Sequence, residues 1–159
     1  MTITKPSVEL IPYTGNVIEH VAKCARVCYN KDIGDDEKTY KNLLKQGHFS
    51  MLRHATYYAI VPVNKFIPLT YFFEIYNQCY QVPGIEINKD VENFYIAYNG
   101  NFEVDHQNYA DSLNDYLVSP EKFESSSIIA KNLMRYTFKI VTQNCTAKEL
   151  NRCKMGCIA

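Results

Sequence analysis

The chain has 159 residues, which is enough for one domain that buries a core, and 47% of them are hydrophobic. Lys and Arg together number 17, as do Asp and Glu, so the formal net charge is zero and argues against a general nucleic-acid binder. Residues 1–15 lack the apolar core of a secretion signal, and no apolar run approaches the length of a membrane span. We therefore expect a cytoplasmic protein with neither nucleic acid nor membrane as a partner.

Two pairs among the six cysteines are spaced four residues apart, so each pair shares a helical face. They are Cys24 with Cys28 and Cys153 with Cys157. This is not the two-residue spacing of a zinc knuckle or of a thioredoxin-like motif. Small buried hydrophobes are favoured over a metal or redox site, so we predict no metal.

The first half of the chain predicts two helices and a strand. Apolar residues recur at a helical period over 16–30, with Asn16 or Thr14 as the N-cap. A second helix over 37–46 begins after a capping Asp35 or Asp36 and ends near Gly47. The β-rich run 55–62 predicts a strand that Pro62 stops.

The second half is less regular. The apolar stretch 66–81 contains Pro68 and fits either helix or strand. The remaining expectations are a hairpin over 94–104 turning at Asn99-Gly100, a helix over 106–117, a helix starting at Ser119-Pro120 and continued by 128–135, a strand over 136–143, and a helix over 146–152 capped by Thr146.

These elements predict one α+β domain over residues 1–159, with a mixed or antiparallel sheet packed with helices. We expect the strands at 55–61 and 136–142 to pair in one sheet. We also expect the helix over 16–29 to pack on that sheet, because both aromatic-rich strands adjoin a cluster of polar side chains.

The first polar cluster lies where the second helix meets the strand. His48, Ser50, Arg53 and His54 crowd this short connection. Such a junction suits a binding site, since loops carry function on a rigid frame. The alternative is that His48 and His54 are hydrogen-bonded structural histidines, and spacing alone favours that alternative.

The second polar cluster is near the C-terminal end of the printed sequence. Lys148 and Arg152 are four apart and therefore share a helical face, with Glu149 and Lys154 beside them. An arginine there can hold a phosphate with two parallel hydrogen bonds. An ordinary solvated helix face explains the same spacing, and spacing alone favours it.

Taken together, three stretches resemble a known family. They are ARVCY at 25–29, GHFSMLRHATYY at 47–58 and FKIVTQNCTAKELNR at 138–152. Their order resembles the flavin-dependent thymidylate synthases, which carry an ARVS-aromatic stretch, a GH-x-[ST]-x-x-EH block and the signature R-H-R-x-x-S-x-x-x-x-S-x-R. Arg152 corresponds to the first Arg of this signature, and Arg53 stands where the family has Glu.

The resemblance implies a fold like that of the thymidylate synthase-complementing proteins and a methyltransferase activity. Members convert dUMP to dTMP with methylenetetrahydrofolate as the one-carbon donor, FAD as the hydride carrier and NADPH as its reductant. They are homotetramers that bind FAD where subunits meet. The resemblance therefore implies a cytoplasmic flavoprotein of nucleotide biosynthesis that forms homo-oligomers.

The resemblance also implies roles for particular residues. Ser50 would contact FAD, with His48 shaping the same turn. Arg152 would lie between dUMP and FAD, while Glu149 falls where the family has a dUMP-contacting Gln. The flavin-contacting positions next to Arg152 are occupied by Cys153, in place of His, and by Lys154, in place of Arg.

The resemblance covers residues 17–62 and 135–159, so residues 63–134 look like an insertion. The family signature continues past Ala159, and its late catalytic Arg falls beyond that residue. We therefore expect the 159-residue chain alone to have no meaningful activity. A non-catalytic domain that binds flavin or nucleotide, or that only assembles with partners, is the alternative.

Overall fold

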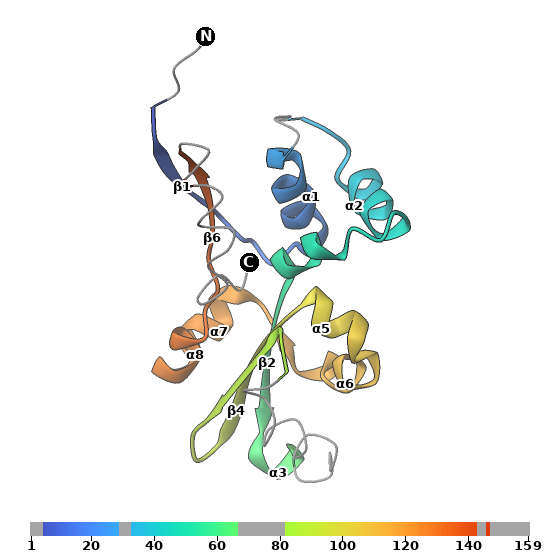
Figure 1. Cartoon of the computed structure of the whole chain (residues 1–159). Helices are drawn as coiled ribbons and strands as arrows, with labels where there is room; N and C mark the ends of the chain where they lie inside the picture. Colours follow the sequence, from blue (N-terminus) through green and yellow to red (C-terminus); the bar gives the residue numbers. More distant parts are fainter. Residues whose placement is uncertain (1–4, 29–32, 67–81, 143–145, 147–159) are drawn as a thin grey trace.

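Two antiparallel sheets of unequal size form the framework of the computed structural model, which describes residues 5–28, 33–66, 82–142 and 146 (Figure 1). The larger sheet has the strand order β3-β4-β2-β5, and the smaller sheet pairs β1 with β6. The strands are β1 (Ser7–Ile11), β2 (Thr56–Pro62), β3 (Ile85–Lys89), β4 (Asn93–Asn99), β5 (Leu117–Val118) and β6 (Thr137–Val141).

Three helices begin directly after capping residues that the sequence predicts. Asn16 accepts a hydrogen bond from the backbone N–H of Glu19, and Asp35 accepts one from Lys38. Ser119 caps the helix that begins at Pro120, as its sequence predicts. The helices are α1 (Val17–Cys28), α2 (Asp36–Lys45), the 3₁₀ helix η1 (Phe49–His54), α3 (Val63–Phe66), α5 (Gly100–Asp105), α6 (Gln107–Ser112), the 3₁₀ helix η2 (Asn114–Tyr116), α7 (Pro120–Ser126) and α8 (Ile128–Asn132).

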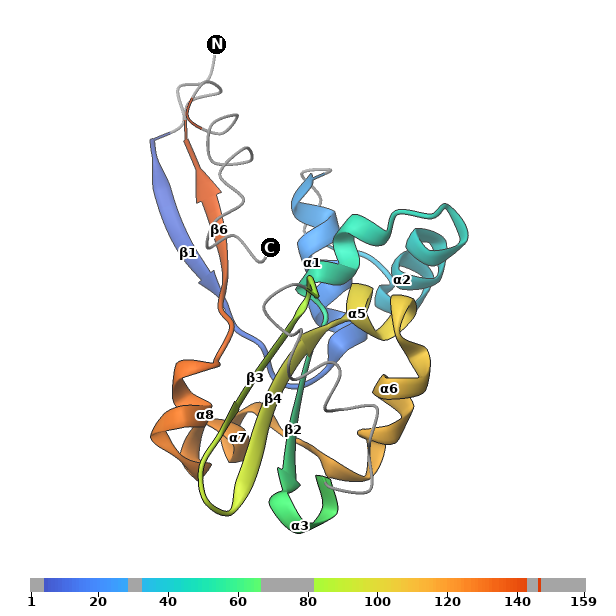
Figure 2. The ribbon, with the colours of Figure 1, turned by 60° about the horizontal axis from the view of Figure 1, so that its bottom comes forward.

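The larger sheet is buried on both faces because its strands alternate between two apolar cores. Ala59 and Ile96 contribute to the core that includes α5 and α6, while Tyr58 and Ala97 contribute to the core under α7 and α8. Figure 2 shows α5 and α6 on one side of the strands and α7 and α8 on the other. The α+β class, with antiparallel sheets packed by helices in one domain, is therefore confirmed.

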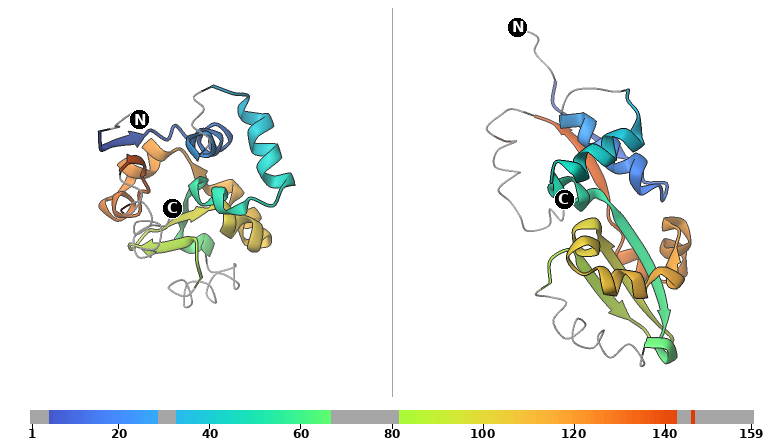
Figure 3. Two further views of the ribbon diagram at one scale, coloured as in Figure 1. Left: turned by 45° about the horizontal axis from the view of Figure 1, so that its top comes forward. Right: turned by 90° about the vertical axis from the view of Figure 1, so that its right-hand side faces the viewer.

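A third core joins α1, α2 and η1. It contains Val21, Ala25, Leu43 and Ala55, with Met51 packed against it. Cys24, on the same helix, is also buried, as expected for a small hydrophobic side chain. Figure 3 shows these helices at one end of the molecule, beyond the larger sheet. None of the helices in the described ranges has the length and apolarity needed to cross a membrane.

The predicted pairing of the strands at 55–61 and 136–142 is wrong. Both sides of β2 are occupied, by β4 and by β5, and both of these partners come from the 63–134 segment. No edge of β2 is left for β6 along Tyr58 and Ala59, so β6 pairs with β1 instead. The helix predicted over 16–29 accordingly packs against α2 and η1 in the third core, rather than on a sheet containing both strands.

The predicted hairpin at Asn99-Gly100 is also wrong beyond its first strand. Asn99 ends β4 and its side chain caps α5, accepting hydrogen bonds from the backbone N–H groups of Asn101 and Phe102. An Asn before a Gly suits either a turn or a helix N-cap, and here the cap wins. The hairpin partner of β4 is β3, and Asp90 in the connecting turn accepts hydrogen bonds from Glu92 and Asn93.

Two other expectations fall on residues outside the described ranges. They are the helix-or-strand choice over 66–81 and most of the helix predicted over 146–152. The segment 63–134, interpreted as an insertion, supplies β3, β4 and β5 of the larger sheet, so it builds the core around β2.

Candidate functional site

His20 lies where three distant parts of the chain meet. It belongs to α1 and is 95% buried, with a relative exposure of 5%. Its Nε2 is 3.1 Å from Oγ1 of Thr137 at the start of β6, and its ring lies edge-on to Tyr13, with centroids 5.0 Å apart. The Tyr13 hydroxyl donates a 2.5 Å hydrogen bond to the carbonyl of Thr56, where β2 begins. His20 therefore joins α1, β6 and the start of β2.

Burial keeps the two histidines of this region neutral. It lowers the pKa of His20 below its usual value; the carbonyl of Pro12 opposes this, and the charge of Lys23 adds to it. Among the described residues, none makes a hydrogen bond of good geometry to Nδ1 of His20. Burial also lowers the pKa of His54 in η1, and the proximity of His20 contributes. His20 therefore influences the protonation of His54 across the α1–η1 contact.

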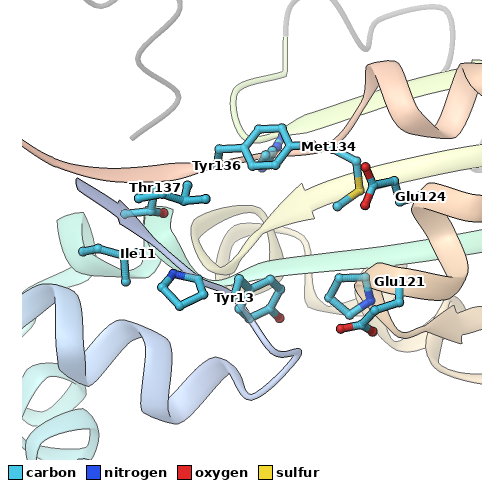
Figure 4. A pocket seen from close by; sticks show the side chains of 11 residues that line it. Ile11, Tyr13, Glu121, Glu124, Met134, Tyr136 and Thr137 are labelled. Carbon is cyan, nitrogen blue, oxygen red and sulfur yellow. The ribbon is translucent and has the colours of Figure 1, made fainter. Parts of the chain in front are cut away.

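A cleft of about 220 Å³ opens beside this junction, between the β1–β6 ladder and α7. Tyr13 and Thr137, which both contact His20, line it. Figure 4 shows Thr137 at one end of the cleft, with Glu121 and Glu124 at the other. The remaining lining residues are Leu10, Ile11, Pro12, Pro120, Met134, Arg135 and Tyr136.

The guanidinium of Arg135 is a largely buried positive charge at the lining of this cleft. Its side chain is 11% exposed, and Nη2 donates long hydrogen bonds to the carbonyls of Ala97 (3.4 Å) and Gly84 (3.5 Å). Nε and Nη1 are buried, and neither has a hydrogen-bond partner in the part of the chain that the structure describes. Burial lowers the pKa of Arg135, and a Glu86 carboxylate 3.9 Å away opposes this. Its backbone N–H donates to the Tyr58 hydroxyl at 3.0 Å, which ties the ladder to the larger sheet.

The cleft's size limits what it can hold. Pockets for drug-sized ligands occupy about 300–1,000 Å³, so 220 Å³ accommodates a single ring or a small fragment and not a dinucleotide such as FAD. Its carboxylates, Glu121 and Glu124, repel a phosphate. A cofactor of that size needs contacts beyond the cleft.

The residues predicted to bind the cofactor are only partly placed. His48 and Ser50 are both exposed, on the short turn where η1 begins, and neither lines the cleft. The backbone of His48 joins α2 to η1, because its N–H donates to the carbonyl of Leu43 and its own carbonyl accepts from Met51. Glu149, Arg152, Cys153 and Lys154 lie outside the described residues.

Sequence reasoning missed His20, Thr137 and Tyr13. A signal for His20 was present, because it follows Val17 by three residues and precedes Cys24 by four, which places it on the apolar side of the helix. No local signal marks Thr137 or Tyr13 as its neighbours.

Comparisons of this chain with protein-family models, with curated proteins and with solved structures find no match. Within the described ranges, no group of three or more His, Cys, Asp or Glu side chains is arranged to hold a metal ion.

Proposed function

We propose that this chain is a cytoplasmic flavin-dependent thymidylate synthase-like protein, which transfers a one-carbon unit from methylenetetrahydrofolate to dUMP with FAD and NADPH. One observation carries the proposal. The two parts of the chain that the resemblance covers, residues 17–62 and 135–159, come together where His20 of α1 contacts Thr137 of β6 and lies near His54 of η1.

This convergence is informative because residues 63–134 separate the stretches in the sequence. α1 and η1 share the third core, but the approach of β6 to α1 depends on the long-range ladder with β1. The α1 helix therefore contacts both η1, which carries the first polar cluster, and β6, which precedes Arg152 in the sequence. That arrangement suits a site assembled from both clusters.

The cofactor supplies the hydride chemistry when it is bound, and the chain's residues hold and orient the reactants. Ser50 offers an exposed hydroxyl at the start of η1, and His48 flanks it. Arg152 is proposed to contact FAD and dUMP through its permanently charged guanidinium. Cys153, Lys154 and Glu149 complete the proposed contacts, with FAD held at an interface between copies of the chain.

A second candidate is a domain that binds flavin or nucleotide without turnover. It is favoured by Arg53, which is exposed and cationic where the family has an acid. The neighbouring cleft is also too small for a whole FAD molecule.

Flavin retention tests the proposal directly. The full chain is purified with FAD present, and the bound flavin is measured by its visible absorbance. Ser50→Ala should weaken binding about threefold to tenfold, as expected for one lost neutral hydrogen bond. Arg152→Ala should weaken it tenfold or more, since a charge-assisted contact contributes about 1.5–3 kcal/mol.

Ser125→Ala, an exposed serine on α7, is the matched control and should retain wild-type affinity. Absence of flavin binding by the wild-type chain would refute the first candidate, and absence of nucleotide binding as well would refute the second. Flavin binding without tritium release from labelled dUMP would favour the second candidate.

A further inference from the structure

The cleft between the β1–β6 ladder and α7 combines aromatic walls with a negatively charged end. The rings of Tyr13 and Tyr136 line it from different sides, and Met134 adds a thioether (Figure 4). Glu121 and Glu124 lie together at one end, three residues apart on α7 and therefore on one side of that helix. Aromatic faces and carboxylates both attract a cation, and this cleft offers both in one space.

The negative charge at this end is not neutralised by the residues that the structure describes. None of the ion pairs found among them includes Glu121 or Glu124. Arg135 also lines the cleft, but its Nη2 lies 3.9 Å from a Glu86 carboxylate oxygen and donates to two backbone carbonyls. The charge of Arg135 is thus already engaged, and the two carboxylates of α7 are left for a ligand.

We propose that this cleft binds a small organic ammonium ion. The charged group would lie beside Glu121 and Glu124, and its alkyl substituents would pack against the rings of Tyr13 and Tyr136. Quaternary ammonium groups are recognised in this way, by aromatic faces together with negative charge. The cleft volume of about 220 Å³ accommodates an ion of this size.

A metal ion is a poorer match to the same cleft. Ca²⁺ takes roughly six to eight oxygen ligands, and two carboxylates supply only part of such a set. In the described ranges, no group of three or more His, Cys, Asp or Glu side chains could hold a metal. Aromatic walls also give a metal ion no oxygen ligand, whereas they favour an alkylated cation.

The inference uses no part of the proposed function. His48 and Ser50, which are proposed to contact FAD, do not line the cleft. An acidic cleft also disfavours anionic ligands such as nucleotides. The cation site can therefore exist without flavin binding, and flavin binding can exist without it.

A titration with choline tests the proposal on the full wild-type chain. Choline is a small quaternary ammonium ion, and 3,3-dimethyl-1-butanol is its uncharged isostere. Binding is followed through the proton NMR signal of the ligand methyl groups. We expect saturable choline binding, weakened by added salt, and affinity for the isostere at least about tenfold lower.

Two substitutions examine the two parts of the site separately. Glu124→Gln removes one carboxylate and should weaken choline binding about fivefold. Tyr136→Leu removes one ring and should weaken it about twofold to fivefold. Tyr136 is 55% exposed, so its replacement leaves the core intact. Glu19→Gln, at an exposed position of α1 that does not line the cleft, is the matched control and should bind as the wild type does.

Each other outcome overturns the proposal. Absence of saturable choline binding, or equal affinity for the isostere, would do so with the wild-type chain alone, without relying on any variant. Unchanged affinity in either Glu124→Gln or Tyr136→Leu, or an equal loss in Glu19→Gln, would show that choline does not bind in this cleft. Displacement of choline by Ca²⁺ at a lower concentration than choline itself requires would assign the cleft to a metal ion.

Discussion

His20 Nε2 and Thr137 Oγ1 lie 3.1 Å apart although 117 positions separate the two residues along the chain. The contact ties the β1–β6 ladder to the helical unit of α1, α2 and η1. Since Nε2 of the buried His20 has Thr137 as its partner, this contact is expected to matter for stability and for pH dependence.

Thr137→Val should lower the free energy of unfolding by about 1–3 kcal/mol, because it leaves a buried ring nitrogen unsatisfied while keeping the side-chain shape. Urea unfolding followed by circular dichroism measures this. Thr137→Ser keeps the hydroxyl and should retain most of the stability. Equal loss in both variants would mean that packing of the methyl group, and not the hydrogen bond, is what matters.

Acidification should destabilise the fold through His20 and His54. Burial holds the pKa of each folded ring below 6.5, so the unfolded chain binds protons first as the pH falls. The stabilisation is complete above about pH 6.5 and is lost as the pH drops through the folded pKa values. Thermal unfolding between about pH 7.5 and 5 should show a falling midpoint.

A double variant, His20→Gln with His54→Gln, should flatten the pH dependence in this range. The pKa of Asp90 is lowered from its usual value, chiefly by a hydrogen bond from the Asn93 backbone. Asp90 therefore titrates below this pH range and does not contribute to the slope. An unchanged slope in the double variant would assign the acid sensitivity to other groups.

Gly84→Ala should be more damaging than Gly47→Ala. Both glycines have positive φ, at 89° and 70°, so each substitution introduces backbone strain. A Cβ on Gly84 would also lie 2.5 Å from Oδ1 of Asn99, whereas one on Gly47 meets nothing closer than 4.0 Å. We expect a loss of about 1–2 kcal/mol for Gly47→Ala and a clearly larger loss for Gly84→Ala. Equal unfolding midpoints in urea would contradict the predicted clash.

Asn99→Ala should destabilise the protein by about 0.5–2 kcal/mol, because the α5 N-cap is lost and two backbone N–H groups lose their acceptor. Asn99→Ser retains a capping oxygen and should recover part of that loss. Guanidinium unfolding of the three proteins gives the comparison. If alanine were tolerated as well as serine, the cap would contribute little to stability.

Local chemistry determined where three of the helices, α1, α2 and α7, begin. Asn16, Asp35 and Ser119 supply cap oxygens to their own backbones within three residues, so their positions are readable without knowledge of the fold. The strand beginning at Thr56 was predictable for the same reason, because its β-rich run ends at a proline. The exposed turn that carries His48 and Ser50 followed from the helix and the strand on either side of it.

Strand partners and the neighbours of His20 were decided only by the tertiary structure. Nothing in the sequence of β2 states that β4 and β5 will occupy both its edges, and this occupation is what sends β6 to β1. A strand can satisfy its backbone groups with any compatible edge, so the choice depends on which edges remain after the rest of the chain has packed. Capping is settled within one turn of chain, whereas strand pairing and the His20 contact with Thr137 are settled by residues far apart in sequence.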